Sequence, residues 1–398
     1  MKILQLCHKT PYPPIDGGSI AMHQITQGML NLGHQVKVVA LDQAANGQAR
    51  QQLPDDYLQA TGFEAQQIDT RVKVLPAFLN LFSGKSYNVQ RFYNRLMERR
   101  LEQILQQQSF DIIQLEGLYL TPYLAVIRRN SVAPVLYRSH NIEHFIWERM
   151  ATASNSLLKK QYLKLLAARL KRYELNVIHQ VDGLVAVSPL DMQFFRQQGF
   201  QKPSIFIPVG IPLQGQPIQA SDKLRPGTVY HLGSMDWRPN QEGVEWFLDK
   251  VWPRVIRHNP SLKFYLAGKN MPARFYRYAS PSVEVLGEVP DAPAFFRPLE
   301  MMVVPLLSGG GMRVKIIEGM AAGKTIVSTS IGAEGIGCED EVNILLADMP
   351  MQMADRIVRY LDDRAAAERI GENGRKFVKE HYDTETIMKS LNDFYKGF

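Results

Sequence analysis

The sequence predicts an α/β fold of two doubly wound, Rossmann-like domains, with the functional site in a cleft between them. Three observations lead to this prediction. The chain has 398 residues, which is too many for one ordinary core. Short apolar runs alternate with helical patterns from end to end, as in parallel sheets that helices cover on both faces. The runs form two series, and open parallel sheets bind ligands at the carboxyl ends of their strands.

Twelve apolar runs are the predicted strands. The first half contains KILQLC, HQVKVVAL, DIIQL, PVLYRSH, DGLVAVS and SIFIPV, and the second contains TVYHLG, LKFYLAG, VEVLG, MMVVPL, KTIVST and NILLA. The stretch between the two series is rich in Pro, Gly, Gln and Ser and has little periodicity. We therefore expect an N-terminal domain at residues 1–207, a linker at 208–227 and a C-terminal domain at 228–380, followed by a last helix within residues 381–398.

Composition excludes several classes of protein. The net charge of +7 favours anionic partners, but Lys and Arg are spread along the chain without a nucleic-acid motif, so we expect no nucleic-acid partner. Cys7 and Cys338 are far apart, which argues against a disulfide framework or a zinc site and for a reducing compartment. No apolar run reaches the length of a membrane span, and the first residues lack the core of a signal peptide. We expect a cytoplasmic protein.

A glycine pair follows the first predicted strand. The chain passes through a proline-rich loop to Gly17 and Gly18, and an apolar helical pattern then runs to Gly33. Glycines just before a helix let the backbone approach a ligand closely, and the free N–H groups there suit a phosphate. A tight turn without a ligand explains this stretch equally well.

Two polar residues follow other predicted strands. Glu116 comes after the strand that begins at Asp111, where it could point into the cleft; an acid on a solvated loop is the alternative that we favour slightly. His140 follows PVLYRS, where it could act on a reacting group or hydrogen-bond a polar substrate, although a structural role is equally common for such a histidine. We interpret His144 as structural.

Arg238 stands in the polar loop of HLGSMDWRPNQEG, before a helix that we expect to start near Asn240. An arginine at this place suits a diphosphate, because a helix N-terminus also attracts anions. An exposed loop arginine is the alternative.

The segment SGGGMRVKIIEGMAAGK carries the most specific pattern, a glycine turn and then a helix from about Met312 to Ala322. The spacing places Glu318 beside Val314, Ala321 and Ala322, on the apolar side of that helix. A carboxylate there suits two vicinal hydroxyls, such as those of a ribose. The helix N-terminus and two cations suit a diphosphate, which makes this set the expected donor site: Gly309, Gly310, Gly311, Met312, Arg313 and Lys315. The alternative for Glu318 is a surface pair with Lys315.

These features together resemble the two-domain GT-B glycosyltransferases, and within them the large retaining family 4, also described as glycosyl transferases group 1. The resemblance rests on the early Gly-Gly loop and on RYELNVIHQVDGLVAVS, IPVGIP and IIEGMAAGKTIVST. The stretches MDWRPNQEGVEWF and GGGMRVKIIEGMAAGK are similar to a bacterial subgroup that acts in exopolysaccharide and cell-surface glycan assembly.

The resemblance implies a role for each matching residue. It places Gly17 and Gly18 near the donor phosphates and His140 in contact with the donor sugar. It makes Arg238 a phosphate ligand and Glu318, the second acid of an E-x7-E motif, a ligand of the nucleotide ribose. His140, Arg238 and Glu318 would be the catalytic residues. The backbone from Gly287 to Val289 should meet the base, and the last helix, from about Thr384, should pack back on the first domain.

The chain departs from the family pattern at two positions. Gly310 stands where the first acid of E-x7-E belongs, and the usual Arg-x4-Lys pair ends at Gly243 instead of a lysine. We expect Arg313 and Lys315 to supply the missing positive charge, since they lie beside the glycine turn.

The implied reaction transfers a hexosyl-type sugar from a nucleotide diphosphate sugar to a hydroxyl of a glycan or lipid-linked acceptor. It proceeds with retention of configuration and needs neither a metal ion nor another cofactor. The alternatives are a nucleotide-sugar epimerase of the same fold, a degenerate homologue that only binds, and a two-domain solute-binding protein.

A basic helical stretch at residues 156–174 could lie on an anionic membrane face and so bring a lipid-linked acceptor within reach. A solvated helix face is the alternative that we favour slightly.

Overall fold

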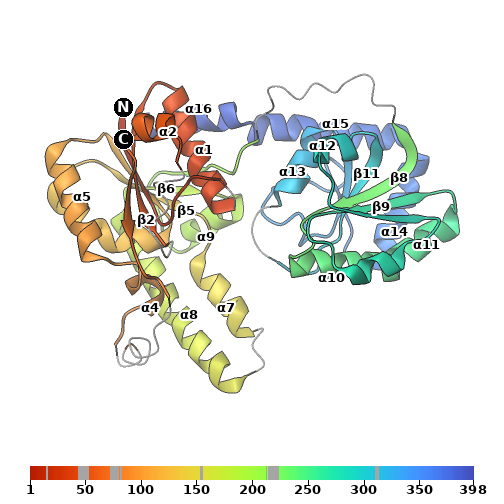
Figure 1. Ribbon diagram of the computed structural model, residues 1–398, viewed down its shortest axis with the longest axis horizontal. Coiled ribbons are helices and arrows are strands. Elements are labelled where there is room, and N and C mark those ends of the chain that lie inside the picture. Colours follow the sequence, from red (N-terminus) through yellow and green to blue (C-terminus); the bar gives the residue numbers. More distant parts are fainter. Residues whose placement is uncertain are drawn as a thin grey trace. The chain divides into compact units, whose positions relative to one another are not determined.

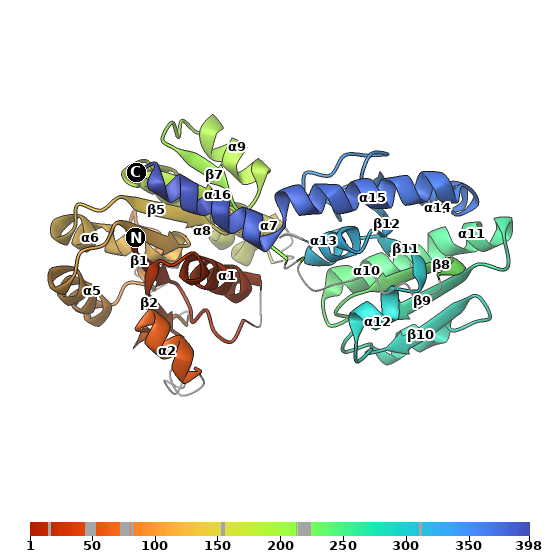
Figure 2. The same ribbon diagram turned by 90° about the horizontal axis from the view of Figure 1, so that it is seen from above.

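The computed structural model divides the chain into two compact units. The first comprises Met1–Gly210 and Ile387–Phe398, and the second comprises Ile211–Thr386 (Figures 1 and 2). The residues that the structure describes are 1–14, 17–43, 53–71, 80, 83–152, 156–211, 213, 224–309 and 313–398. Most of the expected linker, and the candidate donor-site residues Gly310, Gly311 and Met312, lie outside them.

The first unit contains a seven-stranded parallel sheet in the order β3-β2-β1-β4-β5-β6-β7. Its strands are β1 (Lys2–Cys7), β2 (Gln35–Asp42), β3 (Glu64–Gln67), β4 (Ile112–Glu116), β5 (Val135–Ser139), β6 (Gly183–Ala186) and β7 (Ser204–Phe206). The register pairs Cys7 with Glu116 and Glu116 with Arg138, so the carboxyl ends of β1, β4 and β5 lie side by side.

Helices bury this sheet on both faces. They are α1 (Gly17–Asn31), α2 (Asp55–Thr61), α4 (Tyr87–Gln90), α5 (Arg95–Gln107), η2 (Leu118–Tyr123), α6 (Leu124–Asn130), α7 (Glu143–Thr152), α8 (Leu157–Val177), η3 (Ile178–Gln180) and α9 (Pro189–Gln197). Because successive side chains of a strand point to opposite faces, β1 sends Leu4 and Leu6 into one apolar cluster and Ile3 and Cys7 into another.

The second unit contains a six-stranded parallel sheet in the order β10-β9-β8-β11-β12-β13. Its strands are β8 (Arg225–Leu232), β9 (Lys263–Ala267), β10 (Val283–Gly287), β11 (Leu299–Val304), β12 (Thr325–Ser328) and β13 (Leu345–Leu346). Its helices are α10 (Arg238–Trp246), η4 (Phe247–Val251), α11 (Trp252–His258), η5 (Ala273–Tyr278), α12 (Ala292–Phe296), α13 (Val314–Ala321), α14 (Pro350–Asp362) and α15 (Arg364–His381).

The prediction of two doubly wound parallel sheets is confirmed, and each of the twelve predicted runs contains a strand. Strand β3 was not predicted, because its sequence EAQQ is polar and its residues alternate between half-buried and exposed. Buried parallel strands are continuous apolar runs, whereas an edge strand such as β3 has no such signal.

Three helix starts differ from the prediction. Helix α10 begins at Arg238 instead of near Asn240, because Pro239 fits the first turn of a helix, where its missing N–H is not needed. Helix α1 begins at Gly17, so the glycine pair forms its first turn instead of preceding it. Helix α13 begins at Val314, after the turn that carries Arg313.

The C-terminal helix α16 (Thr384–Lys396) belongs to the first unit from Ile387 onward. It buries Met388, Leu391 and Tyr395 in the same cluster as residues of α1. Helix α1 provides Gly28 at the contact, where a Cβ atom would overlap the Met388 side chain. The chain end therefore completes a core that the first 210 residues leave incomplete.

A larger side chain at Gly28 should weaken this contact. We expect Gly28→Leu to lower the free energy of unfolding by about 1–3 kcal/mol, because a well-packed core has no room for added methylenes. Urea unfolding measures this change. The double variant Gly28→Leu/Met388→Ala should lose less stability than the sum of the two single variants, since the changes share one space. Additive losses would contradict the contact.

Candidate functional site

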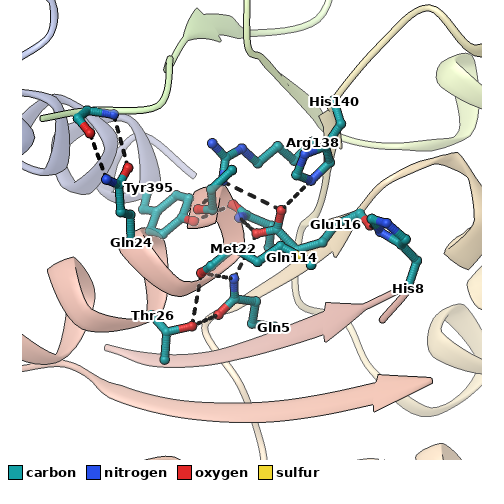
Figure 3. A network of polar contacts seen from close by, with 12 residues as sticks. Gln5, His8, Met22, Gln24, Thr26, Gln114, Glu116, Arg138, His140 and Tyr395 are labelled. Atoms are coloured by element: carbon teal, nitrogen blue, oxygen red, sulfur yellow. Dashed lines mark hydrogen bonds and ion pairs between the residues drawn. The ribbon is translucent and has the colours of Figure 1, made fainter. Parts of the chain in front are cut away.

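Polar residues gather at the carboxyl ends of the strands in each unit. In the first unit the central residue is Glu116, the last residue of β4, which is fully buried. Gln5 and Gln114 donate hydrogen bonds to its Oε1, at 2.8 and 2.6 Å (Figure 3). The favoured sequence interpretation of Glu116 as a solvated loop acid is wrong, because the sheet register brings these partners around it from neighbouring strands.

Glu116 is held as a carboxylate by a buried arginine of β5 and by a histidine in the loop that follows that strand. Arg138 Nη1 lies 3.6 Å from Glu116 Oε2, and His140 Nε2 lies 2.9 Å from the same oxygen. Burial by itself would raise the pKa of Glu116, but Arg138, His140 and Gln5 outweigh it and lower that pKa to about 2. The group is therefore a permanent negative charge at neutral pH and no proton donor.

The same network ties the sheet to two helices. Gln5 accepts a hydrogen bond from Thr26 of α1 at 2.6 Å, and Gln114 accepts one from Tyr395 of α16. Arg138 also donates to the carbonyl oxygen of Ala21, at 2.9 Å. The buried carboxylate thus has indirect connections to both helices that cover this face (Figure 3).

His140, at the carboxyl end of β5, has a defined tautomer. Burial lowers the pKa of His140 below its ordinary value, although Glu116 opposes that effect, so the ring is neutral at neutral pH. Because its Nε2 faces a carboxylate that can only accept, Nε2 carries the proton and Nδ1 is left as an acceptor. The His140 side chain keeps 11% of its surface exposed, which leaves it available to a ligand.

A second histidine, His8, was missed in the sequence. Its Nδ1 lies 2.6 Å from the backbone oxygen of Glu116, and its ring centroid lies 5.7 Å from that of His140. Burial lowers the pKa of His8 to about 4, with a further contribution from His140. His8 directly follows β1 as His140 directly follows β5, and this shared position was the signal that could have revealed it.

Beside these histidines, Glu143 accepts a hydrogen bond from the Tyr119 hydroxyl at 2.7 Å. Burial raises the pKa of Glu143 to about 7; the hydrogen bond from Tyr119 opposes this shift and the nearby Glu174 adds to it. His144 is fully buried, and its Nδ1 lies 2.6 Å from Glu174 Oε2, so it joins α7 to α8.

In the second unit the centre of the polar cluster is Lys315, in the first turn of α13. Its Nζ donates to Asn240 Oδ1 at 2.8 Å and lies 3.5 Å from His231 Nε2. A Cβ atom on Gly233, the residue after β8, would lie 2.6 Å from Lys315 Nζ. The glycine thus leaves room for the lysine at the end of β8.

This lysine lies in a cationic environment. Burial and, to a smaller extent, the charge of Arg313 together lower the pKa of Lys315 to about 7. Its polar contacts among the described residues are the amide oxygen of Asn240 and the neutral ring of His231, whose pKa burial also lowers. An anion bound here would restore the full charge of the lysine.

Arg313, the residue before α13, is buried. Arg313 is 4% exposed, donates to the Ile331 carbonyl oxygen at 3.2 Å and lies over the Trp237 ring, 5.8 Å from its centroid. Gly309 has a φ of +117°, and a Cβ there would lie 2.9 Å from the same tryptophan ring. Trp237 therefore lies close to both Gly309 and Arg313.

The expected burial of Glu318 on the apolar side of its helix is wrong. Helix α13 buries Ile316, Ile317 and Met320, whereas Glu318 is exposed on another side. Val314 and Ala321, the apolar neighbours that suggested burial, are themselves only half-buried. Protein atoms around the carboxyl still displace enough water to raise the pKa of Glu318.

The remaining predicted site residues have these positions. The Arg238 side chain is 85% exposed and pairs with Glu242 at 2.7 Å, one turn along α10. Gly287 ends β10 with a φ of +72°, and Val289 follows it half-buried. Glu318 and Lys315 do not pair, since Lys315 is directed to Asn240.

Within the described residues, no three His, Cys, Asp or Glu side chains group closely enough to hold a metal ion. Among the helices described, none is long and apolar enough to cross a membrane.

Removal of the central charge should destabilise the first unit. We expect Glu116→Gln to lower the free energy of unfolding by about 3–5 kcal/mol, because Arg138 would remain buried without its counter-charge. Urea unfolding at pH 7 tests this, with the exposed Glu148→Gln on α7 as the control.

The pH dependence of this loss has a defined sign. The folded pKa of Glu116, about 2, lies below the unfolded value of about 4.3, so its contribution is complete above that value and is lost as the pH falls. The difference between parent and variant should therefore shrink from about pH 4.3 towards pH 2. A difference that did not change with pH would contradict the assignment.

Comparisons with known proteins agree with this architecture. The family model described as Glycosyltransferase Family 4 matches residues 15–214, and the model described as Glycosyl transferases group 1 matches residues 226–363. The chain is 24% identical over 416 residues to a 44.6 kDa protein in the cps region of Klebsiella pneumoniae, with 98% of each chain covered.

Two solved structures show the same fold. Sucrose-phosphate synthase from Thermosynechococcus elongatus aligns with a TM-score of 0.66 and 15% identity, over 100% of this chain and 99% of that one. Anabaena HepE in complex with UDP aligns with a TM-score of 0.64 and 14% identity, over 100% of both chains. The chain therefore has the GT-B fold and belongs to the group 1, family 4 glycosyltransferases.

Proposed function

We propose that this glycosyltransferase moves a hexosyl-type sugar from a nucleotide diphosphate sugar to a hydroxyl of a glycan or lipid-linked acceptor, with retention of configuration and without a metal ion. The observation that carries the proposal is the pair of cations, Lys315 and Arg313, at the start of α13 in the second unit. The UDP complex of Anabaena HepE, a protein of the same fold, supports a nucleotide donor.

The donor diphosphate would bind at Lys315. Its ammonium lies at the carboxyl end of β8 beside the N-terminus of α13, and free N–H groups at a helix start favour anions. Arg313 adds a second positive charge, and its packing on Trp237 limits its movement. Arg238 would contact the diphosphate only after breaking its ion pair with Glu242, so we assign it a smaller contribution to donor binding.

The ribose would bind at Glu318. Lys315 and Glu318 are three residues apart on α13, so they are neighbours on one side of the helix. A nucleoside diphosphate joins its phosphates directly to the ribose, which matches a cation and an acid about one helical turn apart. Its exposure leaves the carboxylate open to two vicinal hydroxyls.

The first unit would provide contacts to sugar hydroxyls. His140 presents a neutral Nδ1 and His8 a neutral Nε2, and both nitrogens can accept a hydrogen bond from a hydroxyl. Glu116 is a positioning residue in this scheme, since it fixes the tautomer and orientation of His140. It does not touch the reacting atoms.

The chemistry follows from charge development. As the bond from the anomeric carbon to the diphosphate breaks, the sugar becomes oxocarbenium-like and the leaving phosphate gains negative charge. Lys315, Arg313 and the start of α13 would stabilise that charge, which is the part a metal ion plays in other transferases. In this scheme the leaving phosphate accepts the proton of the acceptor hydroxyl, and no protein nucleophile is assigned.

Transfer can be tested directly. A thermal-shift screen of nucleotide sugars identifies the donor, since a ligand at 100 times its dissociation constant adds about 2.7 kcal/mol of stability. The labelled donor is then incubated with glycan and lipid-linked acceptors. We expect a glycoside of unchanged anomeric configuration, turnover that EDTA does not reduce, and a loss of at least about 100-fold in kcat/KM for Glu318→Ala.

Two outcomes would contradict the proposal. Epimerised nucleotide sugar in the absence of any acceptor would indicate an epimerase. Donor binding without turnover for any acceptor would indicate a homologue that only binds.

Donor binding should also take up a proton above neutral pH. With a pKa of about 7 in the free protein, Lys315 is mostly neutral at pH 8, and a bound diphosphate would recharge it. Calorimetry of UDP binding in buffers of different ionisation heats should show uptake at pH 8 and much less at pH 6. Lys315→Arg, which stays charged, should bind UDP without uptake at pH 8; the same uptake in that variant would assign the proton to another group.

A further inference from the structure

Helices α7 and α8 form an arm on the first unit. They pack against each other and run side by side away from the seven-stranded sheet (Figure 1). Helix α8 has 21 residues and so is about 30 Å long. The half of the arm that is distant from the sheet does not cover it, so packing on the sheet does not explain that half (Figure 1).

The base of the arm is held by one buried carboxylate. Glu174 of α8, which is fully buried, accepts hydrogen bonds from the backbone N–H groups of Glu143 and His144 at 3.0 and 3.2 Å. The His144 ring adds a third contact at 2.6 Å. Because these bonds tie the first turn of α7 to the last turns of α8, the two helices leave the sheet together.

The outer surface of the arm is apolar and basic. Four large apolar side chains are exposed there, two on each helix: Ile146 (39%), Met150 (47%), Leu157 (79%) and Leu165 (37%). Residues 146–173, which include all four, contain seven basic residues and one acidic residue, the exposed Glu148. On α8 the face opposite the buried Leu163, Leu166 and Leu170 carries Leu157, Lys164 and Leu165.

We propose that this outer surface docks on an anionic lipid bilayer. Exposed apolar side chains beside basic residues, with Glu148 as the one acid among them, match a layer of negative headgroups above hydrocarbon. Each basic residue near such a surface adds attraction, and apolar side chains at the interface add burial. The excess of positive charge in residues 146–173, seven basic residues against one acid, favours a lipid surface over a protein partner, which would carry acidic residues at specific positions.

Docking would also bring the polar residues at the carboxyl ends of β1, β4 and β5, among them His140, near the membrane. Helix α7 begins three residues after His140 and has 10 residues, so the far end of the arm lies about 15 Å along the helix from that edge. This consequence, which rests on the proposed transferase function, favours a lipid-linked acceptor over a free glycan.

Vesicle flotation of the full chain tests the docking. We expect binding to phosphatidylglycerol-containing vesicles at about 0.05 M salt, little binding to pure phosphatidylcholine, and release at about 1 M salt, where the Debye length is about 3 Å. Lys160→Glu/Lys164→Glu should lower the partition coefficient at least about 30-fold. Leu157→Ser/Leu165→Ser should lower it about tenfold through lost apolar burial.

Arg95→Glu/Arg99→Glu on α5 is the matched control, because both residues are exposed on the same unit, have the same spacing and give the same charge change. It should keep most of the binding. Absence of flotation at low salt, equal binding to neutral vesicles, or equal losses in the two charge variants would overturn the proposal. So would a dimer in solution that the leucine variant dissociates, which would assign the surface to a second copy.

The thermal shift with UDP separates this inference from the donor site. Each arm variant should keep the shift of the parent, since the arm and the donor cluster belong to different units. A variant that lost both vesicle binding and the UDP shift would indicate misfolding and would not count as support.

Discussion

The buried contact between Glu116 and Arg138 is the interaction on which the first unit depends. Two opposite charges removed from water are costly unless each is fully satisfied, and here the sheet register and two glutamines satisfy the carboxylate. The same carboxylate orients His140, and through Gln5 and Gln114 it connects to α1 and α16. A core of this kind couples stability to the site, because what holds the edge of the sheet also sets the state of its histidine.

The second unit places two basic side chains near each other instead of pairing opposite charges. It leaves Lys315 and Arg313 close together at the start of α13, where burial and mutual repulsion lower the pKa of the lysine. Such an arrangement is strained without an anion and relaxed with one, which is typical of a binding site more than of a core. In the first unit Arg138 balances the buried charge of Glu116, whereas the contacts of Lys315 in the second unit, among the described residues, are with the neutral side chains of Asn240 and His231.

Prediction from the sequence succeeded where the physical signal is local. Buried parallel strands are continuous apolar runs, so the twelve runs located strands, and the glycine segment before α13 located a cluster of charges. It failed where the answer depends on distant residues. Glu116 seemed a solvated acid because its partners come from positions 5, 114, 138 and 140. Glu318 seemed buried because its neighbours on the helix are apolar. Such neighbours do not show which side of a helix faces the core, and α13 buries another side.

By itself, then, the sequence determined the fold class, the family resemblance and the segments that carry polar chemistry, because strand periodicity and motif spacing are written along the chain. Only the tertiary structure decided the protonation of the key groups. Glu116 is charged, His8 and His140 are neutral, and the pKa of Lys315 is lowered to about 7. The reason is that a pKa follows from burial and from charges within a few ångströms, and the fold brings those charges together from strands that lie far apart in sequence.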